Sequence, residues 1–322
     1  MKKVVVAIAL LTLSLGVHAQ GRSWWGPRYP KVINISYVES PFNLQIMVMR
    51  ERRMLETAFA AQGIAIAIRW HHINSGADQT NAMAARSLDI ASVINSTSVI
   101  MANAGGNPVH IAALVSRPTH TFALMVNAGG PRTVRELKGK TIAGPKGTTL
   151  HQMLIAALVK EGMSASDVNL IQMGLPEARS ALLANRVDGA LQAASLILRN
   201  EEAGARTLFT ADGYMTPLLF TAVRPAFARD YPDLLRIYLE TQAAAYDWIA
   251  ANTREAVAIG SRIQQITFED GMKLFVWGGI ASVMDPGDLP AVQADVDFLY
   301  HQGMIDRKID PAAIILPAAY SR

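Results

Sequence analysis

The chain has 322 residues, 51% of them hydrophobic, and its 30 basic against 26 acidic side chains give a formal net charge of +4. So small a positive excess, without a dense basic cluster, argues against a nucleic-acid partner. The chain has no cysteine, which excludes disulfides, thiol chemistry and a lipid anchor attached to a cysteine. Its length exceeds what a single core usually supports, so two lobes are expected.

The first 19 residues have the pattern of an export signal. Lys2 and Lys3 precede an apolar run over residues 4–15, and Val17-His18-Ala19 supplies the small residues of a cleavage site. The run is shorter than the roughly 20 residues that a membrane span needs. We therefore expect cleavage after Ala19 and a periplasmic protein.

The next part of the chain alternates short apolar, β-branched runs with Ala-rich stretches. This alternation is typical of a parallel sheet covered by helices. The predicted strands are at 32–37, 64–70, 89–94 and 109–115, and the predicted helices at 44–61, 79–85 and 99–104.

A second lobe is predicted to start where the apolar segment 121–126 carries the chain across. The further predicted strands are at 141–143, 168–173, 187–191 and 218–223, and the helices at 149–160 and 176–184. From Pro225 onward the pattern is helical, and we expect this tail to pack back on lobe 1. Lobe 1 is thus expected at 31–120 and 220–322 and lobe 2 at 121–219, with a double hinge near 118–126 and 212–221.

Four stretches in this order carry a family resemblance, namely 37–43 (YVESPFN), 74–98, 137–163 and 178–191. Together they resemble the nitrate/sulfonate/taurine-type family of ABC substrate-binding proteins. The resemblance implies the α/β type II periplasmic-binding-protein fold, with two lobes that close on a small solute and deliver it to a membrane permease. One feature departs from the family, because Gln192-Ala193-Ala194-Ser195 stands where an aromatic-acidic-proline turn is common.

Candidate ligand residues lie where predicted strands end and helices begin, since helix starts present free N–H groups to an anion. In lobe 1 they are Ser40, Phe42, Asn43, Ser75, Gly76, Asn95, Ser96 and Thr97. In lobe 2 they are Lys146, Gly147, Thr148, Thr149, His151, Gln192 and Ser195. The same hydroxyls and amides could simply cap their helices, so capping and ligand contact are both open.

Five of these candidates have more specific expected roles. Lys146 and His151 are the candidate charge partners of an anionic ligand in lobe 2. Phe42 could form a wall of the pocket or belong to the core. Gln192 and Ser195 could hydrogen-bond in place of the missing acidic turn.

No motif indicates a metal, a cofactor or a catalytic centre. His71 and His72 are adjacent on a predicted strand, so their side chains point to opposite faces. The sequence has neither a GxSxG turn nor a GxxxxGK[ST] loop. A monomeric solute-binding protein is the favoured hypothesis. The alternatives are an enzyme on the same fold, as among pyrimidine-precursor relatives, and a ligand-sensing domain. Trp24 and Trp25 are expected to form an extension or a lid.

Overall fold

The computed structural model of the protein describes residues 29–118 and 120–321. The predicted export signal, Trp24 and Trp25 lie outside these residues. The described residues from Lys31 onward form one compact unit. Among the helices of residues 29–118 and 120–321, none combines the length and apolar character of a membrane span.

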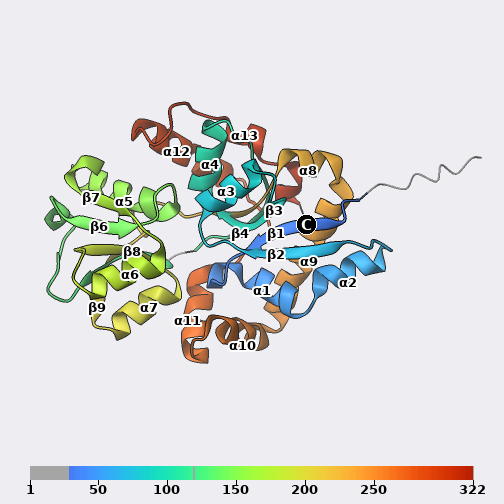
Figure 1. Ribbon diagram of the computed structural model, residues 1–322, viewed down its shortest axis with the longest axis horizontal. Helices are drawn as coiled ribbons and strands as arrows, with labels where there is room; N and C mark the ends of the chain where they lie inside the picture. Colours follow the sequence, from blue (N-terminus) through green and yellow to red (C-terminus); the bar gives the residue numbers. More distant parts are fainter. Residues whose placement is uncertain (1–28, 119, 322) are drawn as a thin grey trace, which may run out of the picture. The chain divides into compact units, whose positions relative to one another are not determined.

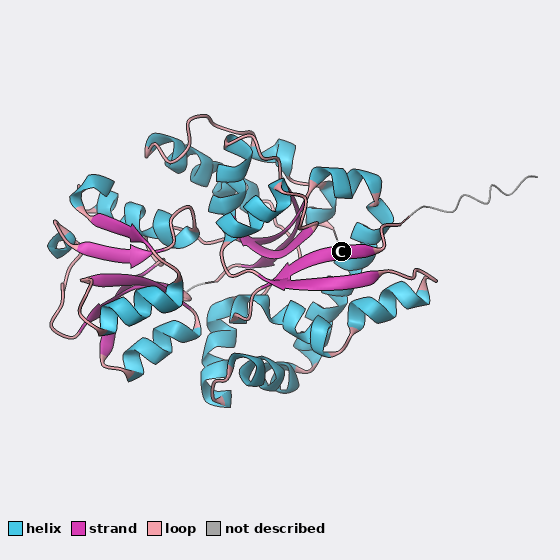
Figure 2. Ribbon diagram, viewed as in Figure 1, coloured by secondary structure: helices cyan, strands magenta, loops and turns pink. Residues whose placement is uncertain are grey.

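Two five-stranded sheets form the framework (Figures 1 and 2). The first has the strand order β2-β1-β3-β10-β4 and defines lobe 1; the second has the order β7-β6-β8-β5-β9 and defines lobe 2. The strands of lobe 1 are β1 (Val32–Tyr37), β2 (Ala67–His72), β3 (Ile90–Asn95), β4 (His110–Ser116) and β10 (Leu219–Val223). Those of lobe 2 are β5 (Phe122–Asn127), β6 (Thr141–Gly144), β7 (Asn169–Gln172), β8 (Gly189–Ala193) and β9 (Ala205–Thr210).

Each sheet is mostly parallel, with one reversed strand. In lobe 1, β1 pairs parallel with β2 and β3, whereas β10 runs antiparallel between β3 and β4. In lobe 2, β6 pairs parallel with β7 and β8, whereas β5 runs antiparallel between β8 and β9. The reversed strands are those that follow each crossing between the sheets, and the predicted α/β fold class is confirmed.

Helices cover both sheets. Lobe 1 has α1 (Leu44–Glu51), α2 (Met54–Ala61), α3 (Gly76–Ala84) and α4 (Ser96–Ala104), and lobe 2 has α5 (Thr149–Lys160), α6 (Leu175–Leu183) and α7 (Ser195–Glu202). The tail adds α8 (Pro225–Asp230), α9 (Pro232–Ala251), α10 (Thr253–Gln264), α11 (Phe268–Gly278), α12 (Asp288–His301) and α13 (Pro311–Ile314). The tail packs on lobe 1, where α9 contacts α1 and α2, and α12 contacts α4.

The predicted helix 44–61 is wrong as a single element. It divides into α1 and α2, because Arg53 adopts a left-handed backbone conformation with φ 52°. Helix α7 and strand β9 follow β8 and were not predicted. Helix α4 begins at Ser96, three residues before the predicted start, so the candidates Ser96 and Thr97 lie within its first turn.

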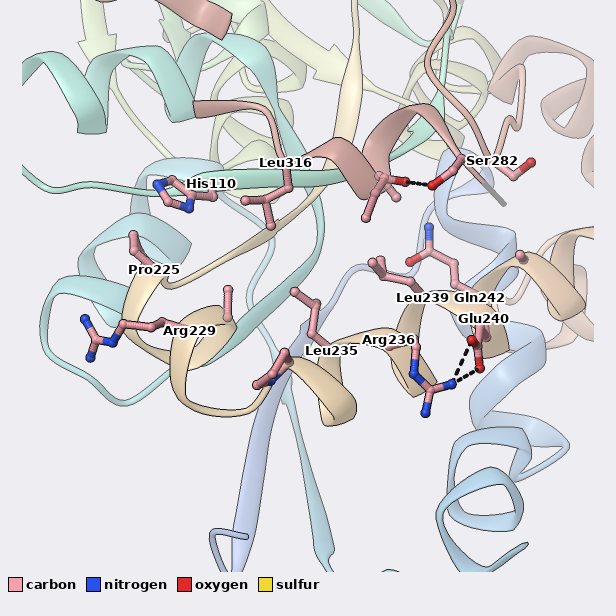
Figure 3. A pocket seen from close by; sticks show the side chains of 16 residues that line it. His110, Pro225, Arg229, Leu235, Arg236, Leu239, Glu240, Gln242, Ser282 and Leu316 are labelled. Carbon is pink, nitrogen blue, oxygen red and sulfur yellow. Dashed lines mark hydrogen bonds and ion pairs between the residues drawn. The ribbon is translucent and has the colours of Figure 1, made fainter. Parts of the chain in front are cut away.

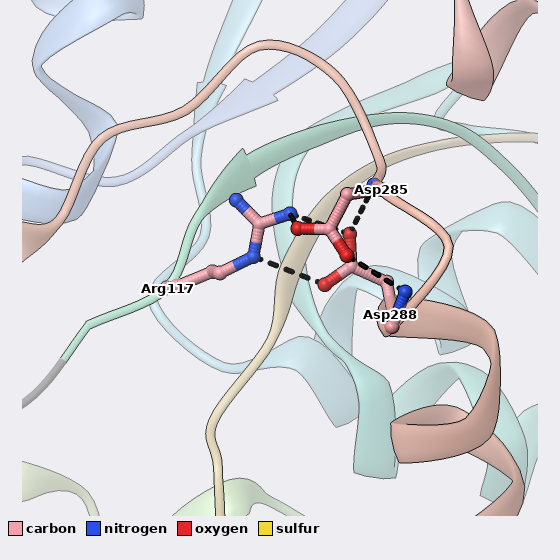
Figure 4. Close-up of polar contacts among 4 residues, drawn as sticks. Arg117, Asp285 and Asp288 are labelled. Carbon is pink, nitrogen blue, oxygen red and sulfur yellow. Dashed lines mark hydrogen bonds and ion pairs between the residues drawn. The ribbon is translucent and has the colours of Figure 1, made fainter.

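The chain leaves the first sheet after β4 and returns to it before β10, and the side chains of Arg117, His120 and Asp212 hold these two crossings in place. The Arg117 guanidinium donates to both carboxylate oxygens of Asp288, at 3.0 and 2.6 Å, and to Asp285 at 2.7 Å (Figure 4). His120 Nδ1 lies 2.7 Å from Asp212 Oδ2, which joins one crossing to the other. Bidentate arginine pairing fixes orientation as well as distance, so the first crossing leaves lobe 1 in a defined direction.

Candidate functional site

Two helix starts of lobe 1 lie against each other. The Ser75 side chain caps α3 by accepting from the Asp78 N–H at 3.4 Å, and the Asn95 side chain caps α4 by accepting from the Ser98 N–H at 2.8 Å. A Cβ on Gly76 would lie 2.6 Å from Ser98 Oγ. Glycine at this position therefore lets the two helix starts approach closely.

The start of α5 in lobe 2 is held differently. Thr148 Oγ1 donates to the Pro145 carbonyl at 2.9 Å and does not cap the helix. The Lys146 N–H donates to Gln172 Oε1 at 2.6 Å. Thr149 Oγ1 is buried and has no hydrogen-bond partner within the described part of the chain. The first N–H groups of α5 thus lack a side-chain cap, and a hydroxyl beside them is unused.

His151, on the first turn of α5, is neutral at pH 7. Burial and the nearby Lys146 lower the pKa of its imidazole to about 4. Its Nδ1 accepts from the Gly147 N–H at 3.3 Å, which requires that this nitrogen carry no proton. A neutral imidazole cannot be the cation expected from the sequence, so the exposed Lys146 is the positive side chain of this junction.

The starts of α4 and α5 meet, although they belong to different lobes. Ser98 Oγ donates to the Gly147 carbonyl at 2.8 Å, and Thr97 Oγ1 donates to Gln152 Oε1 at 2.5 Å. The structure therefore brings together the candidates around Ser75, Asn95 and Thr149 on one contact between the lobes.

A buried polar network continues from this contact. Gln152 Nε2 donates to Asp295 Oδ1 at 2.5 Å, and Ser96 Oγ donates to Asp295 Oδ2 at 2.6 Å. Burial raises the pKa of the Asp295 carboxyl to about 6, although both hydrogen bonds act in the opposite direction. Gln152 and Asp295 were not among the predicted site residues. Asp295 lies between the buried Val292 and Val296 of α12, and this polar position within an apolar helix face could have revealed it.

Three further candidates of lobe 1 lie in or next to η1 (Pro41–Asn43). The Phe42 ring packs on the ring of Phe122 from lobe 2, with centroids 5.8 Å apart. Asn43 is fully buried, and its Nδ2 donates to the Val38 carbonyl at 3.2 Å and to Ser92 Oγ at 3.3 Å. Ser40 precedes η1 and is partly exposed. Phe42 thus lies between the lobes, whereas the Asn43 amide donates to groups within lobe 1.

The turn after β8 has a strained backbone. Ala194 has φ 53° and ψ −128°, a conformation that a residue other than glycine rarely adopts. Such strain is concentrated at functional sites. Beside it, Gln192 Nε2 donates to the Leu175 carbonyl at 3.0 Å, and Gln192 Oε1 is buried without a partner among the described residues. Ser195 lines a cavity of about 410 Å³ between α7 and the α10–α11 connection.

A second cavity, of about 550 Å³, lies elsewhere on lobe 1 (Figure 3). It is lined by α8, α9, the start of β4 and the C-terminal residues up to Ser321, and the Arg236 and Glu240 side chains pair on its rim. None of the candidate ligand residues lines it. The cavity lies at the edge of the first sheet where its parallel strands begin, since His110 is the first residue of β4. Helix α4 starts at the opposite edge, where β3 ends.

The described residues contain no group of three or more His, Cys, Asp or Glu side chains that could hold a metal ion.

Residues 59–256 match the family described as NMT1/THI5 like. The chain belongs to the NMT1/THI5-like family. It is 30% identical, over 98% of its own length and 94% of the relative's, to a Bacillus subtilis protein named for aliphatic sulfonate binding. Relatives with such names support a solute-binding role for the NMT1/THI5-like chain.

Solved structures establish the fold of this NMT1/THI5-like chain. The alkanesulfonate-binding protein SsuA from Xanthomonas axonopodis pv. citri, bound to MOPS, has a TM-score of 0.79 at 20% identity, over 89% of this chain and 98% of that one. SsuA from Escherichia coli has a TM-score of 0.72 at 16% identity, over 91% of this chain and 94% of that one. The type II periplasmic-binding-protein fold expected from the sequence is therefore confirmed.

Proposed function

We propose that this chain captures a small anionic organic solute, of the aliphatic sulfonate class, between its lobes in the periplasm and delivers it unchanged to the permease of an ABC importer. The names of its relatives support the solute class. In this proposal, residues 31–120 with 220–322 and residues 121–219 move as two lobes about the two crossings.

The contact between the starts of α4 and α5 carries the proposal. A sulfonate has three acceptor oxygens and no donor, so inside a protein it needs several hydrogen-bond donors. Uncapped N–H groups at a helix start supply such donors, and the helix dipole favours the negative charge. The α5 start adds the unused Thr149 hydroxyl and the nearby Lys146. An anion held there from lobe 2 would face the start of α4 from lobe 1.

A thermal-shift screen of aliphatic sulfonates, taurine, nitrate and small carboxylates tests the solute class. A solute that binds only the native state stabilises it by about 2.7 kcal/mol at a hundredfold its Kd. A hit that is recovered unchanged by mass spectrometry after long incubation supports binding, whereas steady conversion to a product would establish the enzyme alternative. Stimulation of the partner importer's ATPase in nanodiscs by the loaded protein tests delivery.

Replacing Thr149 tests the position of the site. Because Thr149 Oγ1 has no partner in the described structure, Thr149→Val should leave the Tm of the unliganded protein nearly unchanged. It should weaken solute binding about tenfold, since a hydrogen bond to a charged group contributes about 1.5 kcal/mol. Isothermal titration calorimetry measures the Kd.

The matched control is Thr241→Val. Thr241 is also buried, but its hydroxyl donates to the Ile237 carbonyl within α9, outside the proposed site. This control should lower the Tm slightly and keep the solute Kd. If Thr149→Val keeps the wild-type Kd, the start of α5 is not in the site.

A further inference from the structure

The amide of Gln152 joins the two lobes. Gln152 belongs to α5 of lobe 2, and both ends of its side-chain amide have partners in lobe 1. The oxygen accepts from Thr97 on α4 at 2.5 Å, and the nitrogen donates to Asp295 on α12 at 2.5 Å. Asp295 is in turn fixed within lobe 1 by Ser96 Oγ at 2.6 Å. One side chain of lobe 2 is therefore held between two helices of lobe 1.

The network is enclosed by protein. Ser96 and Thr97 are 0% exposed, Gln152 is 2% exposed and Asp295 is 7% exposed. Buried polar groups stabilise a structure only when their partners are in place, and they specify one arrangement of the elements that carry them. Moving the lobes apart would separate Gln152 from both partners at once. The network can form only when the lobes are closed.

The network also differs from a ligand site. Each of its four side chains already has a hydrogen-bond partner within the protein, in contrast to Thr149, whose hydroxyl lacks one among the described residues. The Thr149 and Gln152 positions are one helical turn apart on α5. A solute at the start of α5 would thus bind beside the network without replacing any part of it.

We propose that Gln152 and Asp295 are positioning residues that latch the closed lobes: they prolong the closed state, and so raise the affinity for a solute bound beside them. This inference rests on the proposed function, in which solute capture closes the lobes. It assigns the latch to side chains that do not contact the solute.

Single-molecule FRET on the mature protein tests the latch. The chain has no cysteine, so Gln62→Cys on lobe 1 and Ala203→Cys on lobe 2, both at exposed positions, accept dyes specifically. The measured quantity is the lifetime of the closed state, without solute and with pentanesulfonate. Gln152→Met keeps the size of the side chain and removes both hydrogen bonds. It should shorten the closed lifetime, and weaken pentanesulfonate binding, about tenfold, as expected for two ordinary hydrogen bonds.

The control variant is Gln45→Met. Gln45 is also a buried glutamine, but its amide donates to the Val115 and Ala281 carbonyls, both within lobe 1, at 2.9 and 3.0 Å. This control should lower the Tm and leave the closed lifetime unchanged. A Gln152→Met variant that behaves like Gln45→Met would show a merely structural role and overturn the latch.

A double-mutant cycle tests whether Thr97 and Gln152 act through one contact. Thr97→Val and Gln152→Met should each shorten the closed lifetime, and the double variant should add little to the larger single effect. Fully additive effects would overturn the assignment. The latch also fails if wild-type protein shows no closed excursions, with or without solute. A wild type that closes but does not respond to any sulfonate contradicts the proposed solute class instead, and the comparison with Gln152→Met still decides the latch.

Discussion

Gly279 combines a left-handed backbone conformation with too little space for a side chain. It has φ 51°, and a Cβ there would lie 2.2 Å from the carbonyl oxygen of Arg117. The Arg117 N–H also donates to the Gly279 carbonyl at 2.8 Å. Any larger residue would therefore push on the backbone at the first crossing between the sheets.

We expect Gly279→Ala to lower the free energy of unfolding by about 3 kcal/mol. This value is the sum of two costs, that of alanine in a left-handed conformation and that of the backbone shift that its Cβ would force. Gly303→Ala is the matched control, because Gly303 has φ 65° and no atom within 4 Å of its would-be Cβ. The control should lose only about 1 kcal/mol. Urea denaturation measures both values, and equal losses would show that the contact with Arg117 is unimportant.

At this scale the sequence predicts where polar residues gather, but not how each side chain points. The candidates at Ser75, Asn95 and Thr149 could be located because helix starts follow strand ends. The orientation of Asn43 could not, since its amide meets Ser92, which is 49 positions away. Ala194 gave no signal either, because nothing in its identity indicates a positive φ.

At the scale of elements, Asp295 links the packing of α4, α5 and α12 to pH. Its folded-state pKa of about 6 lies above the value of about 3.9 expected in the unfolded chain. The stability that it contributes is therefore fully present below about pH 4 and is lost as pH rises through about 6. Two pKa units correspond to a loss on the order of 3 kcal/mol.

We expect Asp295→Asn to abolish this loss of stability with rising pH, because asparagine does not titrate. The difference in unfolding free energy between wild type and variant, measured in urea, should change by about 3 kcal/mol between pH 4 and pH 7. A difference that is the same at both pH values would contradict the raised pKa.

His151 serves as the control of opposite sign. Its pKa is lowered to about 4, so its contribution is present above about pH 6.5 and is lost as pH falls through about 4. His151→Gln should therefore make the protein less sensitive to acid, whereas Asp295→Asn should not. Measuring both variants separates the two groups, whose effects oppose each other between pH 4 and 6.

Elements with local start and stop signals were predicted well. Helix α5 has the predicted bounds, since a Gly-Thr-Thr loop precedes it and Gly162 follows it. The break between α1 and α2 was missed because Arg53, in its left-handed conformation, is not a residue type that signals one. Strand β9 was missed because it is an edge strand that pairs only with β5, and its residues do not alternate regularly between buried and exposed.

At the scale of the molecule, the two sheets differ in how they are assembled from the chain. The second sheet uses one continuous stretch, from β5 at Phe122 to β9 at Thr210. The first sheet is completed only by β10, which inserts between β3 and β4. Contacts between β10 and β4 thus span more than a hundred positions of sequence.

During refolding, we therefore expect the second sheet to form first, because closing shorter loops costs less conformational entropy. Pulsed hydrogen exchange should show early protection of amides in β5 to β9 and later protection in β3, β4 and β10. Simultaneous protection of all these strands, or earlier protection of β10, would contradict this order.

The late insertion of β10 also determines how a truncated chain would behave. A polypeptide that stops before Leu219 could still assemble its second sheet. In its first sheet, however, β3 and β4 would each have a row of unpaired peptide groups along the edge that β10 normally occupies. Exposed edges of this kind recruit strands from other molecules. A chain that terminates before that position should therefore aggregate, and should not simply be a less stable form of the intact protein.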